Sequence, residues 1–521
     1  MVVRGSRAAR ARRIASIAGL IVLVMLIVAI ALVWTARRPI ASNILQREFE
    51  SRGVDASYEL VRVGVRTQQV RNLRIGDPKN PDLTARFAQV EIRIKWNGAV
   101  EIYRVVARGV RLRGRVINNR VTWGQVSKLL PPPSAKPFAF PNMVLDVADS
   151  SISLVTPYGP LGFALEGSGN LTGGFKGRLA AASPKLVPGR CELIGMRSNL
   201  AIEIVARRPH VVGPVRGQRF ACPSSRFLIE QALFNIDSNF SESFTSFDGE
   251  GRMAVQSLVA GENGLANLAG NISFNGTPKA TTGAVNFAAQ RSRLGPIFAD
   301  RTRIGGKYRL GAAAGTFAMV GEYAANGATL APSTLAVISG PLKAASQTPI
   351  GPVATAIGNA IARTGQNFDA SGGIRMVNFP GGGAVRIADS LVKAPSGARV
   401  RVSGGDGVTY YWPSARVRID GQIQMAGGGL PTGRISIRQP RGGGPMSGVA
   451  EFAPYTVGRS RLGMAPIRFA GQRDGSTEVV TIGQLDGPVP NGEVRALRLP
   501  ITARMGSKGG FTFGPRCVVA S

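Results

Sequence analysis

Histidine is almost absent from this chain, and cysteine is scarce. The 521 residues include one histidine, His210, and three cysteines, at 191, 222 and 517. Most acid–base, zinc and Ser-His-Asp chemistry depends on histidine, so the common classes of hydrolase and metalloenzyme are disfavoured. The cysteines lack metal-site spacing, and no phosphate-binding loop is present. We therefore expect no enzymatic activity and no cofactor, and we place His210 in an exposed turn without a role.

Acidic and aromatic residues are also few. Against 64 lysines and arginines stand 30 aspartates and glutamates, which gives a net charge of +34, and aromatic residues make up 7%. Such a charge attracts nucleic acid or anionic lipid. The chain has no zinc-finger spacing, basic helix or aromatic-studded basic strand, so we expect no nucleic-acid partner. Solvated strand faces coated with arginine would also account for the charge, and this alternative stays open.

Charge is missing altogether from residues 14–36. As a helix this segment would be about 34 Å long, enough to cross a hydrocarbon core of about 30 Å. Five arginines precede it and two follow it, so residues 1–13 are expected in the cytoplasm and the bulk in the periplasm. The segment is longer than the apolar core of a signal peptide, and residues 34–37 make a poor cleavage site. We predict a single-pass anchor in a bacterial inner membrane.

Long helical patterns are rare beyond this segment, whereas glycine and short alternating segments are common. Residues 87–96, 110–116 and 417–425 each place apolar side chains at every second position, which is typical of β-strands with one apolar face. We predict a mainly β fold. The side chains expected on the apolar face of the first strands are Val90, Ile92, Ile94, Trp96, Val110 and Leu112.

Two helices and one joint interrupt the predicted strands. A helix is expected over residues 40–52, ended by a left-handed Gly53. A second, amphipathic helix is expected over 349–364, with Thr348 as its N-cap and Gly365 at its end. Prolines between 131 and 141 predict a joint. This joint separates a helix-plus-strand block, 37–130, from an extended β region, 142–521.

The cysteines fit an oxidising compartment. Cys191 and Cys222 are candidates for a disulfide that closes a loop of about 30 residues. Cys517 lies in Gly-Pro-Arg-Cys, which is similar to the Pro-Gly-Arg-Cys around Cys191, yet it has no partner. We expect either that this chain is the front part of a longer protein or that Cys517 is a free or intermolecular thiol.

Strands with one apolar and one charged face allow two architectures. A curled sheet could leave the apolar side open as a groove for hydrocarbon chains, because shielding apolar surface is worth about 25 cal/mol per Å². A β-sandwich or solenoid filled by its own side chains explains the same alternation. The residues alone leave both possibilities open.

The N-terminal region resembles the AsmA-like superfamily of bacterial envelope proteins. The resemblance rests on the anchor followed by a short helix and a strand, and on residues 70–78, 82–85 and 105–112. Within that superfamily the body is similar to the YdbH-like branch, through Cys222-Pro223, the helix 349–364 and residues 368–371.

The resemblance implies an elongated, curled β-groove that is anchored in the inner membrane and carries phospholipid toward the outer membrane. Phospholipids, the inner membrane and outer-membrane proteins would be its partners, and the six apolar residues of the first strands would line the groove. The alternative is a structural factor that assists outer-membrane assembly without carrying lipid. An enzyme of envelope carbohydrate would need a carboxylate pair that cannot be located in the sequence.

Overall fold

The computed structural model describes residues 49–513, apart from 65, 97–99, 119, 131–136, 314, 349, 490–491 and 506–509. The chain divides into unit 1, Met1–Gly261 with Leu268–Gly283, and unit 2, Glu262–Asn267 with Ala284–Ser521. The predicted anchor 14–36, most of the predicted helix 40–52, and Cys517 lie outside the described residues. Within the described part, no helix combines the length and the apolar character that crossing a bilayer requires.

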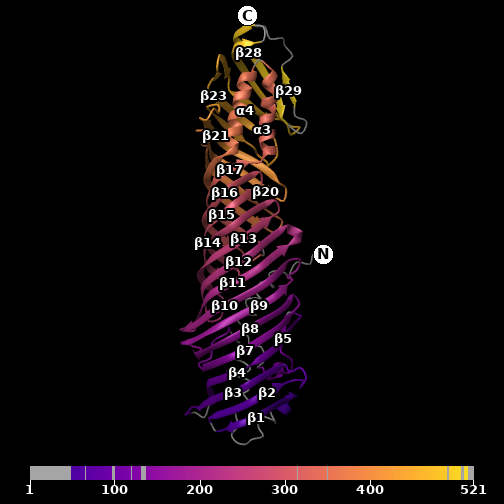
Figure 1. Ribbon diagram of the computed structural model, residues 1–521, viewed down its shortest axis with the longest axis vertical. Coiled ribbons are helices and arrows are strands. Elements are labelled where there is room, and N and C mark those ends of the chain that lie inside the picture. The colour runs from indigo at the N-terminus through magenta and orange to yellow at the C-terminus, as the bar shows by residue number, and fades with distance from the viewer. Residues whose placement is uncertain are drawn as a thin grey trace. The chain divides into compact units, whose positions relative to one another are not determined.

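Strands dominate both units, which confirms the predicted mainly β fold (Figure 1). Neighbouring strands of unit 1 pair antiparallel, except that β7 pairs in parallel with both β4 and β5. The elements of unit 1 are β1 (Ala56–Val63), β2 (Thr67–Ile75), β3 (Leu83–Ile94), β4 (Val100–Arg108), β5 (Arg111–Ile117), β6 (Arg120–Thr122), η1 (Gly124–Leu129), β7 (Val144–Thr156), β8 (Gly159–Asn170), β9 (Phe175–Leu186), β10 (Glu192–Val205), β11 (Arg208–Cys222), η2 (Pro223–Ser225), β12 (Phe227–Phe240) and β13 (Phe247–Ala260).

Two strands, β14 (Asn263–Thr277) and β15 (Ala280–Leu294), are each divided between unit 1 and unit 2. Unit 2 is again antiparallel, with β23 paired to β26 and β25 to β27. Its remaining elements are β16 (Ile297–Leu310), β17 (Phe317–Leu330), α3 (Pro332–Ala344), η3 (Ala345–Gln347), α4 (Gly351–Gln366), β18 (Phe368–Phe379), β19 (Gly382–Lys393), β20 (Arg399–Trp412), β21 (Arg416–Ala426), β22 (Gly433–Arg438), β23 (Ser447–Phe452), β24 (Tyr455–Val457), β25 (Ser460–Met464), β26 (Ile467–Gly471), β27 (Thr477–Val489), β28 (Gly492–Met505) and β29 (Gly510–Phe513).

Bulges keep the apolar side chains of unit 1 on one face of its sheet. In β7, Val147 and Ile152 are five residues apart, so strict alternation would place them on opposite faces. The register to β8 shifts between Val147 and Ser150, where Asp149 has a φ of 47°. This extra residue returns Ile152 and Leu154 to the face of Val147, and all three are buried.

The Asp149 bulge is held from the charged side of the sheet. Arg111 Nη2 donates a hydrogen bond to Asp149 Oδ1 at 2.6 Å, and Arg86 donates to the other carboxylate oxygen. The hydrogen bond from Arg111, together with the charges of both arginines, lowers the pKa of Asp149. The bulge therefore keeps its carboxylate ionised on the face opposite to the apolar side chains.

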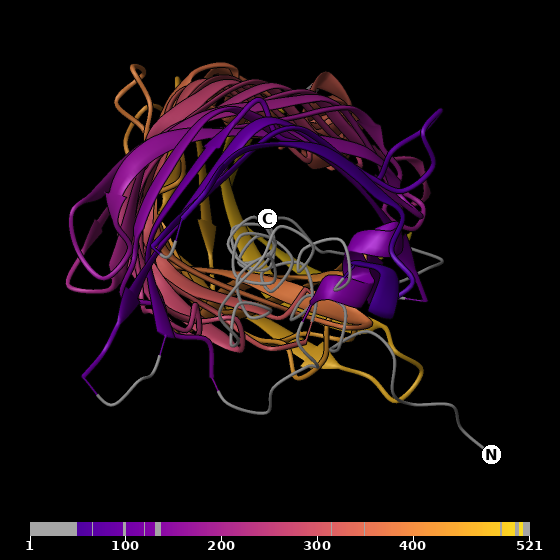
Figure 2. The ribbon, with the colours of Figure 1, turned by 90° about the horizontal axis from the view of Figure 1, so that it is seen from below.

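Two short helical segments cover the apolar face where the first strands begin. They lie inside the curve of the indigo and purple strands in Figure 2. Phe49 stands in the first segment, which ends at Gly53 with a φ of 60°, as predicted. The second is η1. The buried core beneath both segments contains Phe49, Leu73, Ile75, Leu83, Leu112, Trp123, Val126, Leu129, Ile152 and Leu154.

The chain on the two sides of the predicted joint 131–141 is joined by hydrogen bonds. β7 follows this segment, and it pairs with β4 and β5, which precede it. Phe140, at the end of the segment, is buried with Met143 in a second core of unit 1.

In unit 2, α3 and α4 form an insertion between β17 and β18, which pair directly with each other. α4 begins at Gly351, two residues later than predicted, after an N-cap residue, Ile350, that gives no side-chain hydrogen bond. Thr348 is not the N-cap, because its hydroxyl donates to Ala345 O at 2.6 Å. Gly365 does not end the helix, because α4 continues to Gln366. Gly365 is buried, and a Cβ there would meet Leu335 at 2.5 Å.

α4 packs on the sheet of unit 2 through small side chains. Ala360 is fully buried and forms a cluster with Ala398 and Leu430, against which Ile361 and Val400 also pack. Part of the apolar stripe predicted for this helix therefore contacts protein.

Candidate functional site

The strands β10 to β13 of unit 1 carry a second, uncovered stretch of the apolar face. Paired residues of antiparallel strands have their side chains on the same face. Val215 pairs with Phe234, and Phe234 pairs with Met253 on the next strand. Ile202 pairs with Val211 in the same way. We call this surface the inner face, and its members include Leu200, Ile202, Val211, Val215, Phe234, Ile236 and Met253.

These inner-face side chains are partly exposed, whereas the core under η1 is closed to solvent. Across the described residues of unit 1, no helix makes more than slight contact with β10, β11 or β12. Apolar surface in water is unfavourable by about 25 cal/mol per Å², so such a face favours an apolar ligand.

Glycine lets the aromatic rings lie flat on the inner face. Gly251 of β13 is next to Phe234 of β12, and a Cβ at Gly251 would meet the Phe234 ring at 2.4 Å. The absence of that Cβ lets the ring cover the backbone of β13. The same arrangement recurs at Gly249, where a Cβ would meet the Phe274 ring at 3.0 Å. The inner face is consequently apolar even where its residues are glycines.

Six phenylalanines form a continuous row along one side of unit 1. Consecutive ring centroids in the row are separated by 4.9, 6.2, 6.0, 6.3 and 6.0 Å. Aromatic rings attract one another at such distances. In order, the phenylalanine row consists of Phe138, Phe140, Phe244, Phe240, Phe247 and Phe274.

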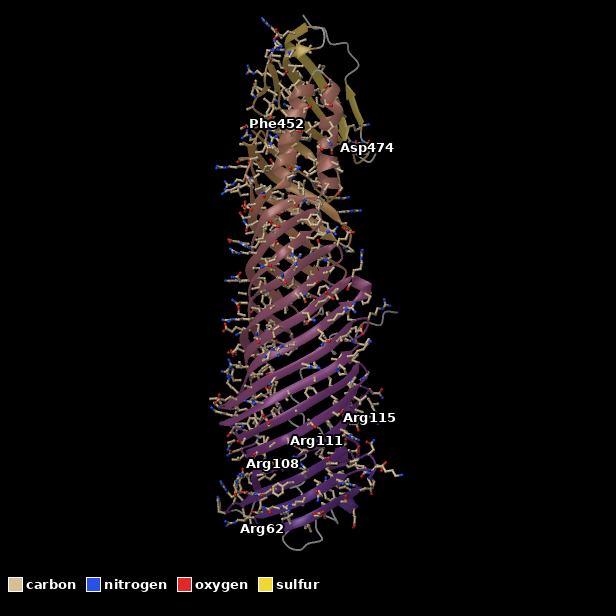
Figure 3. The ribbon with its side chains drawn as sticks, in the orientation of Figure 1. Arg62, Arg108, Arg111, Arg115, Phe452 and Asp474 are labelled. Carbon is tan, nitrogen blue, oxygen red and sulfur yellow. A yellow bond between two sulfur atoms is a disulfide. The ribbon has the colours of Figure 1, made fainter. Side chains whose placement is uncertain are left out.

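The charged face is opposite to the inner face. Arg197 pairs across the strands with Arg216, and Arg252 pairs with Asn235. Arg108, Arg111 and Arg115 lie on the outer side of the sheet in Figure 3. The strong positive charge of the chain is therefore carried in part by the side of the sheet that faces away from the apolar side chains.

A polar clasp holds the first half of the phenylalanine row in place. Glu242 Oε1 accepts a hydrogen bond from the Phe140 N–H at 2.8 Å and another from Arg207 Nη1 at 2.8 Å. Arg207 also donates to Phe140 O at 2.9 Å. The hydrogen bond from Arg207, reinforced by that from Phe140, lowers the pKa of Glu242. The clasp thus joins three segments that are distant in sequence.

We expect the clasp to weaken in acid. A carboxylate whose folded-state pKa is lowered stabilises the fold above its unfolded pKa, about 4.3, and this stabilisation is lost as the pH falls through the folded pKa. Glu242→Gln should make the Phe140 amide exchange hydrogen about fivefold faster at pH 7. At a pH below the folded pKa of Glu242, wild type and variant should exchange alike. Equal exchange rates at pH 7 would contradict the clasp.

Three of the six predicted groove residues share the apolar face of β3. Val90 is 8% exposed and pairs with Val105, Ile92 is partly exposed, and Ile94 is 48% exposed. Trp96 lies in the turn after β3 and is fully exposed, at 100%, so it does not pack on the apolar face.

The other two predicted groove residues belong to the covered core. Leu112 is 1% exposed, and Val110 packs against the same cluster beneath Trp123 of the η1 region. Leu112 therefore has no surface to offer a ligand in this structure.

Sequence reasoning missed the residues that carry the open part of the inner face. In β12, Phe227 and Ile229 alternate, and Ala232, Phe234 and Ile236 alternate, but the two series are out of step. Gln231, with a φ of 50°, lies between them, and the register to β11 and β13 is the same on both sides of it. The strand reads as irregular because one residue in the left-handed conformation interrupts the alternation. Two alternating runs offset by one position were the available signal.

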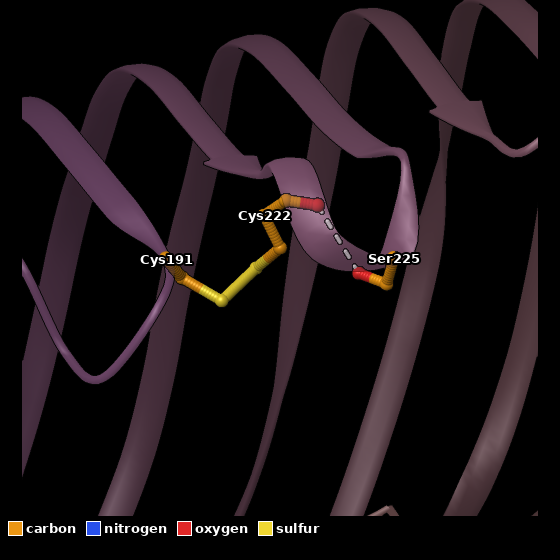
Figure 4. Close-up of a disulfide and its surroundings, with 3 residues drawn as sticks. All are labelled: Cys191, Cys222 and Ser225. Carbon is orange, nitrogen blue, oxygen red and sulfur yellow. Dashed lines mark hydrogen bonds between the residues drawn. A yellow bond between two sulfur atoms is a disulfide. The ribbon is translucent and has the colours of Figure 1, made fainter.

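Cys191 and Cys222 form a disulfide in unit 1 (Figure 4), with an S–S distance of 2.05 Å. It joins the turn before β10 to the end of β11, where Ser225 Oγ donates to Cys222 O at 3.2 Å. The prediction that His210 lies in an exposed turn is wrong, because His210 lies within β11. Its Nε2 is 2.7 Å from Asp237 Oδ1 on the charged face.

Among the described residues no group of histidine, cysteine, aspartate or glutamate could hold a metal ion. The two faces of its sheet place unit 1 in the class of proteins in which a curled β-sheet presents an apolar inner face and a charged outer one. The family model of the YdbH-like family, described as intermembrane phospholipid transport protein YdbH, matches residues 24–293, which are 270 of the 521 residues. The chain belongs to the YdbH-like family, and the predicted resemblance is confirmed. No individual curated protein matches the chain.

The residues that match the family model include the candidate site. Residues 24–293 include every strand from β1 to β14 and the whole phenylalanine row. The family is one of lipid transport rather than of enzymes.

Proposed function

We propose that unit 1 binds phospholipid, with the acyl chains lying on the inner face of β10 to β13. The observation that carries this proposal is the partial exposure of a surface made almost wholly of apolar side chains. An acyl chain would remove that surface from water while the polar headgroup stayed outside. The family's description as an intermembrane phospholipid transport protein supports the same ligand.

In this proposal residues 14–36 anchor the chain in the bacterial inner membrane and the body lies in the periplasm. The uncharged segment and its flanking arginines support this orientation. Phospholipid would be carried toward the outer membrane. The apolar face of β3 is closer to the anchor in sequence than β10 to β13 are. Its residues Val90, Ile92 and Ile94 would contact the lipid there.

Site-specific photocrosslinking in cells tests the ligand. Ile236 and Asn235 are neighbours in β12 whose side chains lie on opposite faces, and Asn235 is exposed. A photoreactive residue in place of Ile236 should give lipid adducts, detected by mass spectrometry after proteolysis. The same residue in place of Asn235 is the matched control and should give few.

The outcome separates the proposal from its competitor. Equal lipid labelling at both positions, or none at Ile236, would contradict the proposed inner-face site. Protein adducts without lipid at Ile236 would favour an assembly factor.

A further inference from the structure

A hollow on the charged face of unit 2 gathers three arginines. Its volume is about 590 Å³, and Arg399, Arg401 and Arg434 line it together with Glu451 and apolar side chains that include Leu391 and Ala426. The hollow differs from the inner face of unit 1 in its residues, its charge and its unit.

Strand register accounts for the arrangement. Leu391, Arg401, Gln424, Arg434 and Glu451 pair in succession from β19 to β23, which places them in one row across five strands. Adjacent strands are about 4.8 Å apart, so Arg401 and Arg434 flank Gln424 across roughly 10 Å. Both guanidinium groups can therefore reach a ligand above Gln424.

The charges in the hollow are only partly compensated. Arg434 Nε is 2.7 Å from Glu451 Oε2. The side chains of Arg399 and Arg401 form no hydrogen bond or ion pair with any described residue. Lys393 pairs across the strands with Arg399 and adds a further positive charge beside the hollow. Within the hollow, one carboxylate thus faces three arginines, and Lys393 has Asp369 as its cross-strand neighbour.

We propose that this hollow binds a phosphate group, with Arg401 and Arg434 as its principal ligands and Arg399 in support. Guanidinium groups bind phosphate through paired, charge-assisted hydrogen bonds. The apolar side chain of Leu391, which pairs with Arg401, would contact a hydrocarbon portion attached to the phosphate. The phosphate could be free or carried by a phospholipid headgroup.

Binding measurements on the purified full chain test this proposal. Two probes are used. The first is sn-glycerol 3-phosphate, which carries glycerol and phosphate but no acyl chain, and the second is short-chain phosphatidylglycerol below its critical micelle concentration. The double substitution Arg401→Gln with Arg434→Gln should weaken the binding of sn-glycerol 3-phosphate at least about tenfold. Arg303→Gln removes an exposed arginine of β16 outside the hollow, and it should leave that binding unchanged.

Glu451→Gln should act in the opposite direction. Removing the carboxylate frees Arg434 from its partner, so affinity for sn-glycerol 3-phosphate should rise about threefold. A structural role of the arginines alone would not produce this gain.

Each result bears on the site. Tighter binding of phosphatidylglycerol than of sn-glycerol 3-phosphate, lost in the double variant, supports a lipid-borne phosphate, and equal affinities support a free one. Unchanged binding of sn-glycerol 3-phosphate in the double variant, or no binding by wild type, overturns the proposal. The crosslinking at Ile236 uses none of these residues, so the two proposals fail separately.

Discussion

Phe234→Asp should remove most of the phospholipid that stays with the chain on purification, by tenfold or more. The ring lies in the middle of the inner face, between Val215 and Met253 of the adjacent strands. An acyl chain that covered a carboxylate at this position would have to remove the water that hydrates it. A polar group buried without a partner costs about 2–7 kcal/mol, and tenfold in affinity is about 1.4 kcal/mol.

Two further substitutions separate charge from packing and from position. Phe234→Ala removes the ring without adding charge, so it should retain more lipid than Phe234→Asp. Asn235→Asp places the same carboxylate one residue away on the exposed, opposite face, and it should retain lipid as wild type does. Lipid phosphorus per chain after detergent extraction is the measurement, with thermal unfolding as the check on folding. Equal loss from Phe234→Asp and Asn235→Asp would contradict the inner face as the site.

Replacing both cysteines of the disulfide should cost about 3–4 kcal/mol of unfolding free energy, because the loop that the bond closes spans about 30 residues. The sequence separation of Cys191 and Cys222 is 31. β10 and β11, between the two cysteines, already pair in the folded state, so the bond acts mainly on the unfolded chain. Denaturant unfolding of Cys191→Ser with Cys222→Ser, compared with wild type, measures the loss.

Reductant provides the internal control for the disulfide. It should bring wild type to the stability of the double serine variant and leave that variant unchanged. Cys517→Ser keeps the bond and should unfold like wild type. If the double variant were as stable as oxidised wild type, the bond would not constrain the unfolded chain as expected.

The alternating segments predicted the strands well. Residues 87–96, 110–116 and 417–425 correspond to β3, β5 and β21, because side chains on a strand alternate whatever the rest of the fold does. The same rule placed Val90 and Ile92 on one face. The glycine at 53 also has its predicted left-handed conformation, since that preference is local.

Alternation failed where an irregular backbone or a cover intervenes. Asp149 is an inserted residue in β7, and Gln231 of β12 has a left-handed conformation, so the inner face of both strands looks irregular in the linear sequence. Leu112 has the same pattern as Ile94, which is 48% exposed, yet η1 covers Leu112 and makes it part of a core. Which protein segment lies over an apolar side chain depends on contacts between residues far apart in the chain.

By itself the sequence determined the mainly β class, the separation of apolar from charged faces, and the likeness to the YdbH-like family. These follow from local alternation, composition and short motifs, which act within a few residues. Only the tertiary structure decided which apolar residues are closed cores and which stay open. The open part of the inner face, the phenylalanine row and the arginine hollow arise from strand register, because register brings together side chains that no spacing in the sequence connects.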